Sequence, residues 1–101
     1  MKIKIEIQHF NGCPNSPILI ERVKEAIKDF SDVEYQEILI DSNEKAKEAK
    51  FRGSPTLLIN GVDFENLPES ENPNLACRFY PNGLPTFDEI RRKLIQLQNE
   101  I

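Results

Sequence analysis

Residues 53–64 read Gly-Ser-Pro-Thr-Leu-Leu-Ile-Asn-Gly-Val-Asp-Phe, and this stretch predicts a strand, a tight turn and a returning strand. The apolar run at residues 56–59 is typical of a short buried strand. The dipeptide Asn60-Gly61 favours a two-residue hairpin turn, because both central residues of that turn need positive φ angles. We therefore expect residues 62–64 to pair with the strand before them.

Upstream of this hairpin, residues 2–9 predict a first strand and residues 17–30 predict a first helix. The isoleucines of the strand share one face and its polar residues share the other, a pattern that is unusual for a central parallel strand. In the helix, apolar residues recur at three- and four-residue spacing. Ser16 suits the N-cap of this helix, and Pro17 suits its first position.

A second strand and a second helix follow before the hairpin. Residues 33–40 predict the strand. Residues 43–51 predict a short, charged helix that is capped by Ser42 or Asn43 and stopped by Gly53.

The C-terminal third predicts a long loop and a last helix. Four prolines between residues 65 and 85 indicate a loop. Thr86, with Glu89 three residues later, predicts a capping box at the start of the helix. We expect the apolar side of this helix to consist of Phe87, Ile90, Leu94, Leu97 and Ile101.

The resulting order, β-α-β-α-β-β-α, predicts an α/β fold that forms a single domain over residues 1–101. Its two β-α-β connections are expected to build parallel pairing, and the hairpin adds an antiparallel edge.

Charge and composition narrow the possible partners. A net charge of −4 gives no electrostatic attraction to phosphate backbones, so we expect no nucleic-acid partner. The sequence contains no run of 18 apolar residues, so we expect no membrane span. The alternating N-terminus does not resemble a signal peptide, so we expect a cytoplasmic protein. Two cysteines and one histidine do not supply a closed four-ligand zinc site, and we expect neither a metal nor a cofactor.

Three motifs, in this order along the chain, resemble the thioredoxin fold, a mixed four-stranded sheet flanked by helices. The first, Cys13-Pro14-Asn15-Ser16, stands where that family carries a Cys-x-x-Cys or Cys-x-x-Ser motif. The second, residues 53–58, is similar to the segment that holds the family's cis-proline, and the hairpin follows it.

The resemblance implies that the backbone of Ser54 borders Cys13 and pairs with an extended substrate segment. It thereby implies that Ser16, Ser54 and Pro55 contribute to substrate binding. Because Ser16 replaces the second cysteine of the motif, a dithiol exchange confined to the motif is impossible.

Cys13 is the candidate nucleophile. A thiolate attacks disulfides, and a helix N-terminus favours negative charge near the position expected for Cys13. Gly12 and Pro14 mark an exposed turn, which favours a functional thiol over a small buried apolar residue. Ser16 could donate its hydroxyl to the thiolate or merely cap the helix.

The strand directions expected for such a sheet bring Cys77 toward Cys13. The third strand starts at the Cys13 end, the fourth returns to it, and the loop that carries Cys77 leaves from there. We hypothesise that Cys77 replaces the missing motif cysteine as the resolving thiol while Cys13 attacks. The alternative is a buried loop anchor, with Leu75 and Phe79 packed beside it.

Other residues near these cysteines allow more than one interpretation. Arg78 could lower a thiol pKa, bind an anionic ligand or be an ordinary surface arginine. His9 could act as a base or be a polar strand terminus. Tyr80 and Phe79 are expected to close the loop over the core, and Asp63 and Glu65 could flank the site.

Three functions of different classes follow. The first is a thiol–disulfide redox protein that acts on a protein disulfide or a low-molecular-weight thiol or disulfide. The second is a soft-metal or mercury-binding thiol protein, since the Gly-Cys-Pro and Ala-Cys-Arg segments are distantly similar to organomercury lyases. The third is an adaptor that keeps a thioredoxin-like fold without its chemistry.

Overall fold

The computed structural model describes residues 2–100, which form four strands and three helices. None of these helices is long and apolar enough to cross a membrane. In chain order the elements are β1 (Ile3–His9), α1 (Asn15–Ile27), β2 (Val33–Leu39), α2 (Asn43–Ala49), β3 (Thr56–Ile59), β4 (Val62–Asp63) and α3 (Phe87–Asn99). The element order agrees with the predicted one, and Ile101 lies outside the described residues.

The sheet is mixed, with strand order β2-β1-β3-β4. β1 runs parallel to β2 and antiparallel to β3, and β3 pairs with β4 through the predicted hairpin. Asn60 and Gly61 both have positive φ angles, 52° and 81°, as this turn requires.

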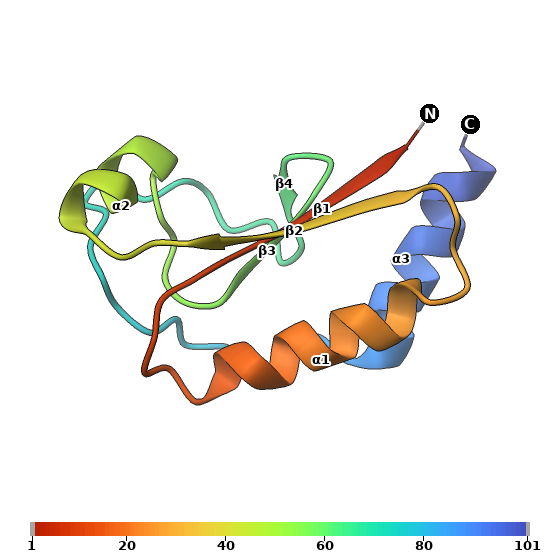
Figure 1. The fold of residues 1–101 in the computed structure, drawn as a ribbon, viewed down its shortest axis with the longest axis horizontal. Coiled ribbons are helices and arrows are strands. Elements are labelled where there is room, and N and C mark those ends of the chain that lie inside the picture. Colours follow the sequence, from red (N-terminus) through yellow and green to blue (C-terminus); the bar gives the residue numbers. More distant parts are fainter. Residues whose placement is uncertain (1, 101) are drawn as a thin grey trace.

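The expectation of parallel pairing from the second β-α-β connection is wrong, and the length of α2 explains why. α2 has seven residues and therefore spans roughly 10 Å. The seven residues of β2 span about 23 Å. α2 is therefore too short to return the chain to the edge of the sheet at which β1 and β2 begin. β3 therefore enters the sheet at the edge where β2 ends, and α2 lies beyond that edge (Figure 1).

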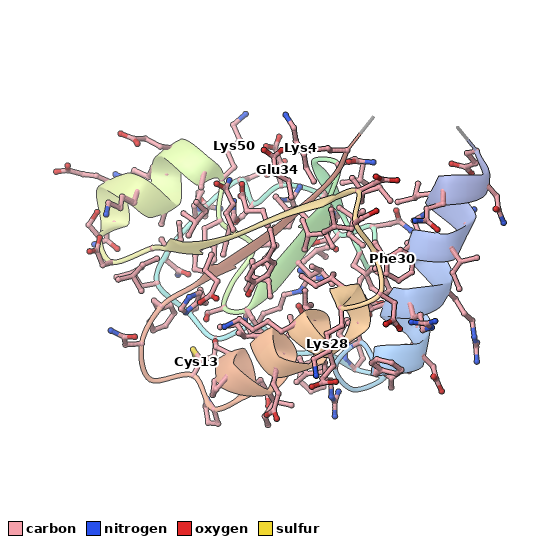
Figure 2. The ribbon with its side chains drawn as sticks, turned by 45° about the vertical axis from the view of Figure 1, so that its right-hand side comes forward. Lys4, Cys13, Lys28, Phe30, Glu34 and Lys50 are labelled. Atoms are coloured by element: carbon pink, nitrogen blue, oxygen red, sulfur yellow. A yellow bond between two sulfur atoms is a disulfide. The ribbon has the colours of Figure 1, made fainter. Side chains whose placement is uncertain are left out.

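The core lies between the sheet and the helices α1 and α3, which cover one face (Figure 1). The other face of the sheet is polar, and Lys4 and Glu34, neighbours across β1 and β2, project away from α1 (Figure 2). This open face explains the alternating pattern of the central strand β1. The buried residues of the core are Ile3, Ile5, Ile7, Leu19, Val23, Ala26, Leu57, Ile59, Ile90 and Leu94.

The predicted starts of α2 and α3 agree with the structure, whereas both ends of α1 and the end of α2 differ from the prediction. The side chain of Ser42 accepts a hydrogen bond from Lys45 N–H, and the capping box at Thr86 is present as predicted. α2 ends at Ala49, and the residue that stops it is Lys50 in the left-handed conformation, not Gly53. α1 begins at Asn15 with Pro14 as its N-cap, so the assignment of Ser16 as the N-cap is wrong.

The early start of α1 has a local cause. The N–H of Ser16 donates to the carbonyl of Cys13 over 3.1 Å, which adds a turn before Pro17. Pro14 lacks an N–H, which costs nothing at a helix start, where such groups have no partner in the helix.

Candidate functional site

Cys13 and Cys77, 64 positions apart in the sequence, are joined by a disulfide with a Cα–Cα distance of 5.7 Å. Cys13 lies between the end of β1 and the start of α1, where its sulfur is visible in Figure 2. Cys77 comes from the long loop that follows β4. The structure thus brings together the two thiols that the expected strand directions placed at one end of the sheet.

The two halves of this disulfide differ in exposure. Cys77 is exposed, whereas Cys13 is only 4% exposed. Gly12 and Pro14 are exposed, as expected for a turn. The thiol between them is nevertheless covered, because the loop that carries Cys77 lies against it, and the expectation of an exposed Cys13 is wrong for this disulfide form.

The segment 76–78 is held against Ser54 by backbone hydrogen bonds on both sides. The N–H of Ser54 donates to the carbonyl of Ala76 over 2.8 Å, and the N–H of Arg78 donates to the carbonyl of Ser54 over 2.9 Å. Cys77 is the residue that pairs with Ser54 in this parallel bridge. The peptide bond between Ser54 and Pro55 is cis. The backbone that was expected to pair with a substrate therefore pairs here with the chain's own cysteine segment.

Arg78 anchors this segment through a buried ion pair with Asp63 of β4. Its guanidinium donates to both carboxylate oxygens, over 2.7 Å to Oδ1 and 3.0 Å to Oδ2. The side chains of Arg78 and Asp63 are 6% and 2% exposed. Arg78 is thus neither a surface residue nor a free anion-binding group.

The environment of Asp63 stabilises its charged form. Burial alone raises the pKa of this carboxyl. The hydrogen bond from Arg78, the backbone N–H groups of Leu67 and Glu65 and the positive charge of Arg78 together outweigh burial, so the pKa of Asp63 lies below its ordinary value. The carboxylate therefore remains ionised and keeps Arg78 in place near neutral pH.

Tyr80 provides a second anchor for the loop. Its hydroxyl donates to the carbonyl of Pro55, and its ring lies 4.6 Å from the guanidinium carbon of Arg78. Burial, the largest influence, raises the pKa of Tyr80 to about 12. Leu75 and Phe79, which the alternative interpretation of Cys77 packed beside it, are instead 37% and 82% exposed. The expectation for Tyr80 is thus met, whereas Leu75 and Phe79 do not anchor the loop.

Gly53, in the loop before β3, lies in close contact with Arg78. A Cβ atom added at Gly53 would lie 2.8 Å from the Cβ of Arg78 and 3.0 Å from its Cα. The φ angle of Gly53 is +108°, which side chains rarely adopt. Only glycine allows the two segments to approach this closely.

Ser16 and Ser54 tie the start of α1 to the same loop. Their hydroxyl oxygens lie 2.8 Å apart in a buried hydrogen bond, and Ser54 Oγ also accepts from the N–H of Phe10 over 3.1 Å. The hydroxyl of Ser16 therefore neither caps α1 nor stays free in the disulfide form. Ser16, Ser54 and Pro55 are all buried next to the two cysteines.

His9 lies at the end of β1, and its Nε2 is 3.9 Å from Oε1 of Glu37 on the neighbouring strand. The sequence interpretation did not identify the pair of Arg78 and Asp63. A charged residue between the apolar residues Val62 and Phe64, on a strand beside a buried one, was the available signal.

Comparison with models of known protein families gives no match. Two curated proteins are similar to this chain, each named "Probable Thioredoxin", from Methanothermobacter marburgensis and Methanothermobacter thermautotrophicus. Each is 42% identical over 65 residues, which cover 61% of this chain and 75% of the relative.

Proposed function

Because the chain belongs to the thioredoxin family, we propose that it is a thiol–disulfide oxidoreductase whose redox couple is Cys13 and Cys77. The observation that carries this proposal is the disulfide between two cysteines that are remote in sequence. Ser16 removes the second thiol of the usual motif, and Cys77 restores a dithiol from another part of the chain.

In the dithiol form, Cys13 is assigned the attacking role. Its thiolate attacks one sulfur of a substrate disulfide and releases the other as a thiolate. Cys77 then attacks the sulfur of Cys13 in the mixed disulfide and releases the second substrate thiol. The substrate gains two electrons, and Cys13 and Cys77 become a disulfide. The position of Cys13 before α1 supports this role, since a helix N-terminus stabilises a thiolate.

Substrate binding in the dithiol form is proposed at Ser54 and Pro55, with Ser16 holding Ser54 in place. In the disulfide form both backbone groups of Ser54 are bonded to residues 76–78. A substrate segment that pairs with Ser54 therefore has to displace this segment. The proposed partners are a protein disulfide or a small thiol compound, and the proposed compartment is the cytoplasm, where reducing systems regenerate such dithiols.

The test is a redox titration in glutathione buffers, followed by intact mass measurement and peptide mapping. We expect one two-electron transition between a Cys13–Cys77 disulfide and a dithiol, and its loss in Cys13→Ser and in Cys77→Ser. Two thiols that stay free across the whole series would contradict the proposal. Stoichiometric binding of a soft metal by such a chain, abolished by either substitution, would favour the metal-binding alternative.

A further inference from the structure

The disulfide joins two cysteine residues, and the structure exposes these residues unequally to an external thiol. The whole of Cys13 is 4% exposed, so little of its sulfur can be approached from solvent. Cys77 is exposed, and its neighbours Ala76 and Phe79 are exposed as well. An attacking thiolate must reach the sulfur with which it forms a bond, so access decides which half of the disulfide reacts.

We infer that external thiols open this disulfide at Cys77 and that Cys13 is the leaving thiolate. This inference rests on the proposed redox function with a protein disulfide as the substrate. It assigns the recycling step, in which a small thiol, a different reagent that does not displace residues 76–78 from Ser54, reduces the disulfide. The attacking thiolate RS⁻ bonds to the sulfur of Cys77 while the Cys13–Cys77 bond breaks with its electron pair on Cys13. A second external thiolate then bonds to RS, releases Cys77 as a thiolate and leaves the oxidised reductant RS–SR.

The position of Cys13 favours it as the leaving group. A leaving thiol of lower pKa departs faster, and the N-terminus of α1 begins directly after Cys13 and Pro14. Cys77 lies in the loop between β4 and α3, and its backbone neighbours are bonded to Ser54. Access and leaving-group stability therefore favour the same direction of cleavage.

The segment that presents Cys77 is held by bonds that do not involve sulfur. Ser54 fixes the backbone on both sides of Cys77, and Arg78 is fixed by its ion pair with Asp63. Opening the disulfide leaves these contacts intact. The mixed disulfide on Cys77 thus stays beside the Cys13 thiolate, which can close the bond again unless a second external thiol arrives first. Asp63 and Arg78 are positioning residues for this step.

The test maps the first adduct. Oxidised full-length protein is mixed with excess reduced glutathione, quenched with acid after short times, alkylated with N-ethylmaleimide and digested with trypsin. Cleavage after lysine and arginine places Cys13 on a peptide of residues 5–22 and Cys77 on a peptide of residues 53–78. The two sites are therefore read separately by mass.

We expect glutathione on Cys77 and N-ethylmaleimide on Cys13, with an excess of about tenfold over the opposite pattern at the earliest times. Glutathione mainly on Cys13, or equally on both, would overturn the inference while leaving the redox function standing. If the two peptides stay linked at every glutathione concentration, the redox function itself fails, and the recycling step fails with it.

A variant pair tests the positioning role. Asp63→Asn removes the charge that holds Arg78 and keeps both tryptic peptides. We expect the preference for Cys77 to fall severalfold in this variant. The control is Arg91→Gln, which removes the exposed ion pair with Asp29 and should leave the ratio unchanged. An unaltered ratio in folded Asp63→Asn would exclude the positioning role, and the wild-type measurement stands even if this variant does not fold.

Discussion

Reducing the disulfide between Cys13 and Cys77 should lower the free energy of unfolding by about 4 kcal/mol. The bond closes a loop of 64 residues, and the loss of chain entropy for a loop of that length gives this value in the unfolded-state model. By the thermodynamic cycle, the free energy of forming the disulfide must differ by the same amount between the folded protein and the unfolded chain. The equilibrium constant for forming the bond should therefore be roughly 10³-fold larger in the folded protein, since each 1.4 kcal/mol is a factor of ten.

Two measurements check this value independently. The first is urea unfolding of the oxidised and the reduced protein, monitored by circular dichroism. The second is the glutathione equilibrium of the disulfide, measured in buffer and again in concentrated urea. A variant with both cysteines replaced by serine is the control, and its unfolding should not respond to reductant. A difference below about 1 kcal/mol in both measurements would refute the reasoning, because the fold would then not hold the two sulfurs together better than the flexible chain does.

Three further predictions concern the contacts around the site. Replacing Arg78 by glutamine leaves the carboxylate of Asp63 buried and should lower the free energy of unfolding by about 3 kcal/mol in urea titrations. The matched control, Phe79→Ala, removes a side chain that is 82% exposed and should change it by less than about 0.5 kcal/mol; equal effects would contradict the anchoring role of Arg78. Because the pKa of Asp63 is lowered on folding, its contribution to stability should be complete above the ordinary value of about 3.9 and be lost as the pH falls below it. Thermal unfolding from pH 6 to pH 2 tests this, and Asp63→Asn should show a shallower acid loss than the wild type. Thr86→Ala removes the hydroxyl that accepts from Glu89 N–H and should cost about 1 kcal/mol in urea unfolding, and a cost near zero would show that the cap contributes nothing.

Local sequence patterns predicted the elements well because their causes are local. The hairpin at Asn60 and Gly61 follows from the φ angles of two residues, and the capping box at Thr86 follows from side chains three positions apart. The proximity of Cys77 to Cys13 followed from strand directions, which a thioredoxin-like sheet determines. The direction of β3 relative to β1 agrees with the thioredoxin resemblance but not with the β-α-β pattern, because that pattern does not account for how far α2 can carry the chain.

Contacts between distant segments explain what the sequence did not reveal. Arg78 and Phe79 are adjacent, yet one is buried against Asp63 and the other is almost fully exposed. Nothing in the loop sequence indicates which of them turns inward, since this depends on the carboxylate of β4. The burial of Cys13 likewise depends on a segment 64 positions away.

Gly53 gives the site a vulnerability that is separate from its chemistry. Arg78 lies so close that even a methyl group at position 53 would push the two chain segments apart. A mutation there leaves both sulfurs, the serines and the ion-pairing groups chemically unchanged, yet shifts the loop that carries one half of the couple. Inherited loss of activity in this chain can therefore arise at a residue without any functional group, and a search for harmful variants that inspects only reactive side chains would overlook it.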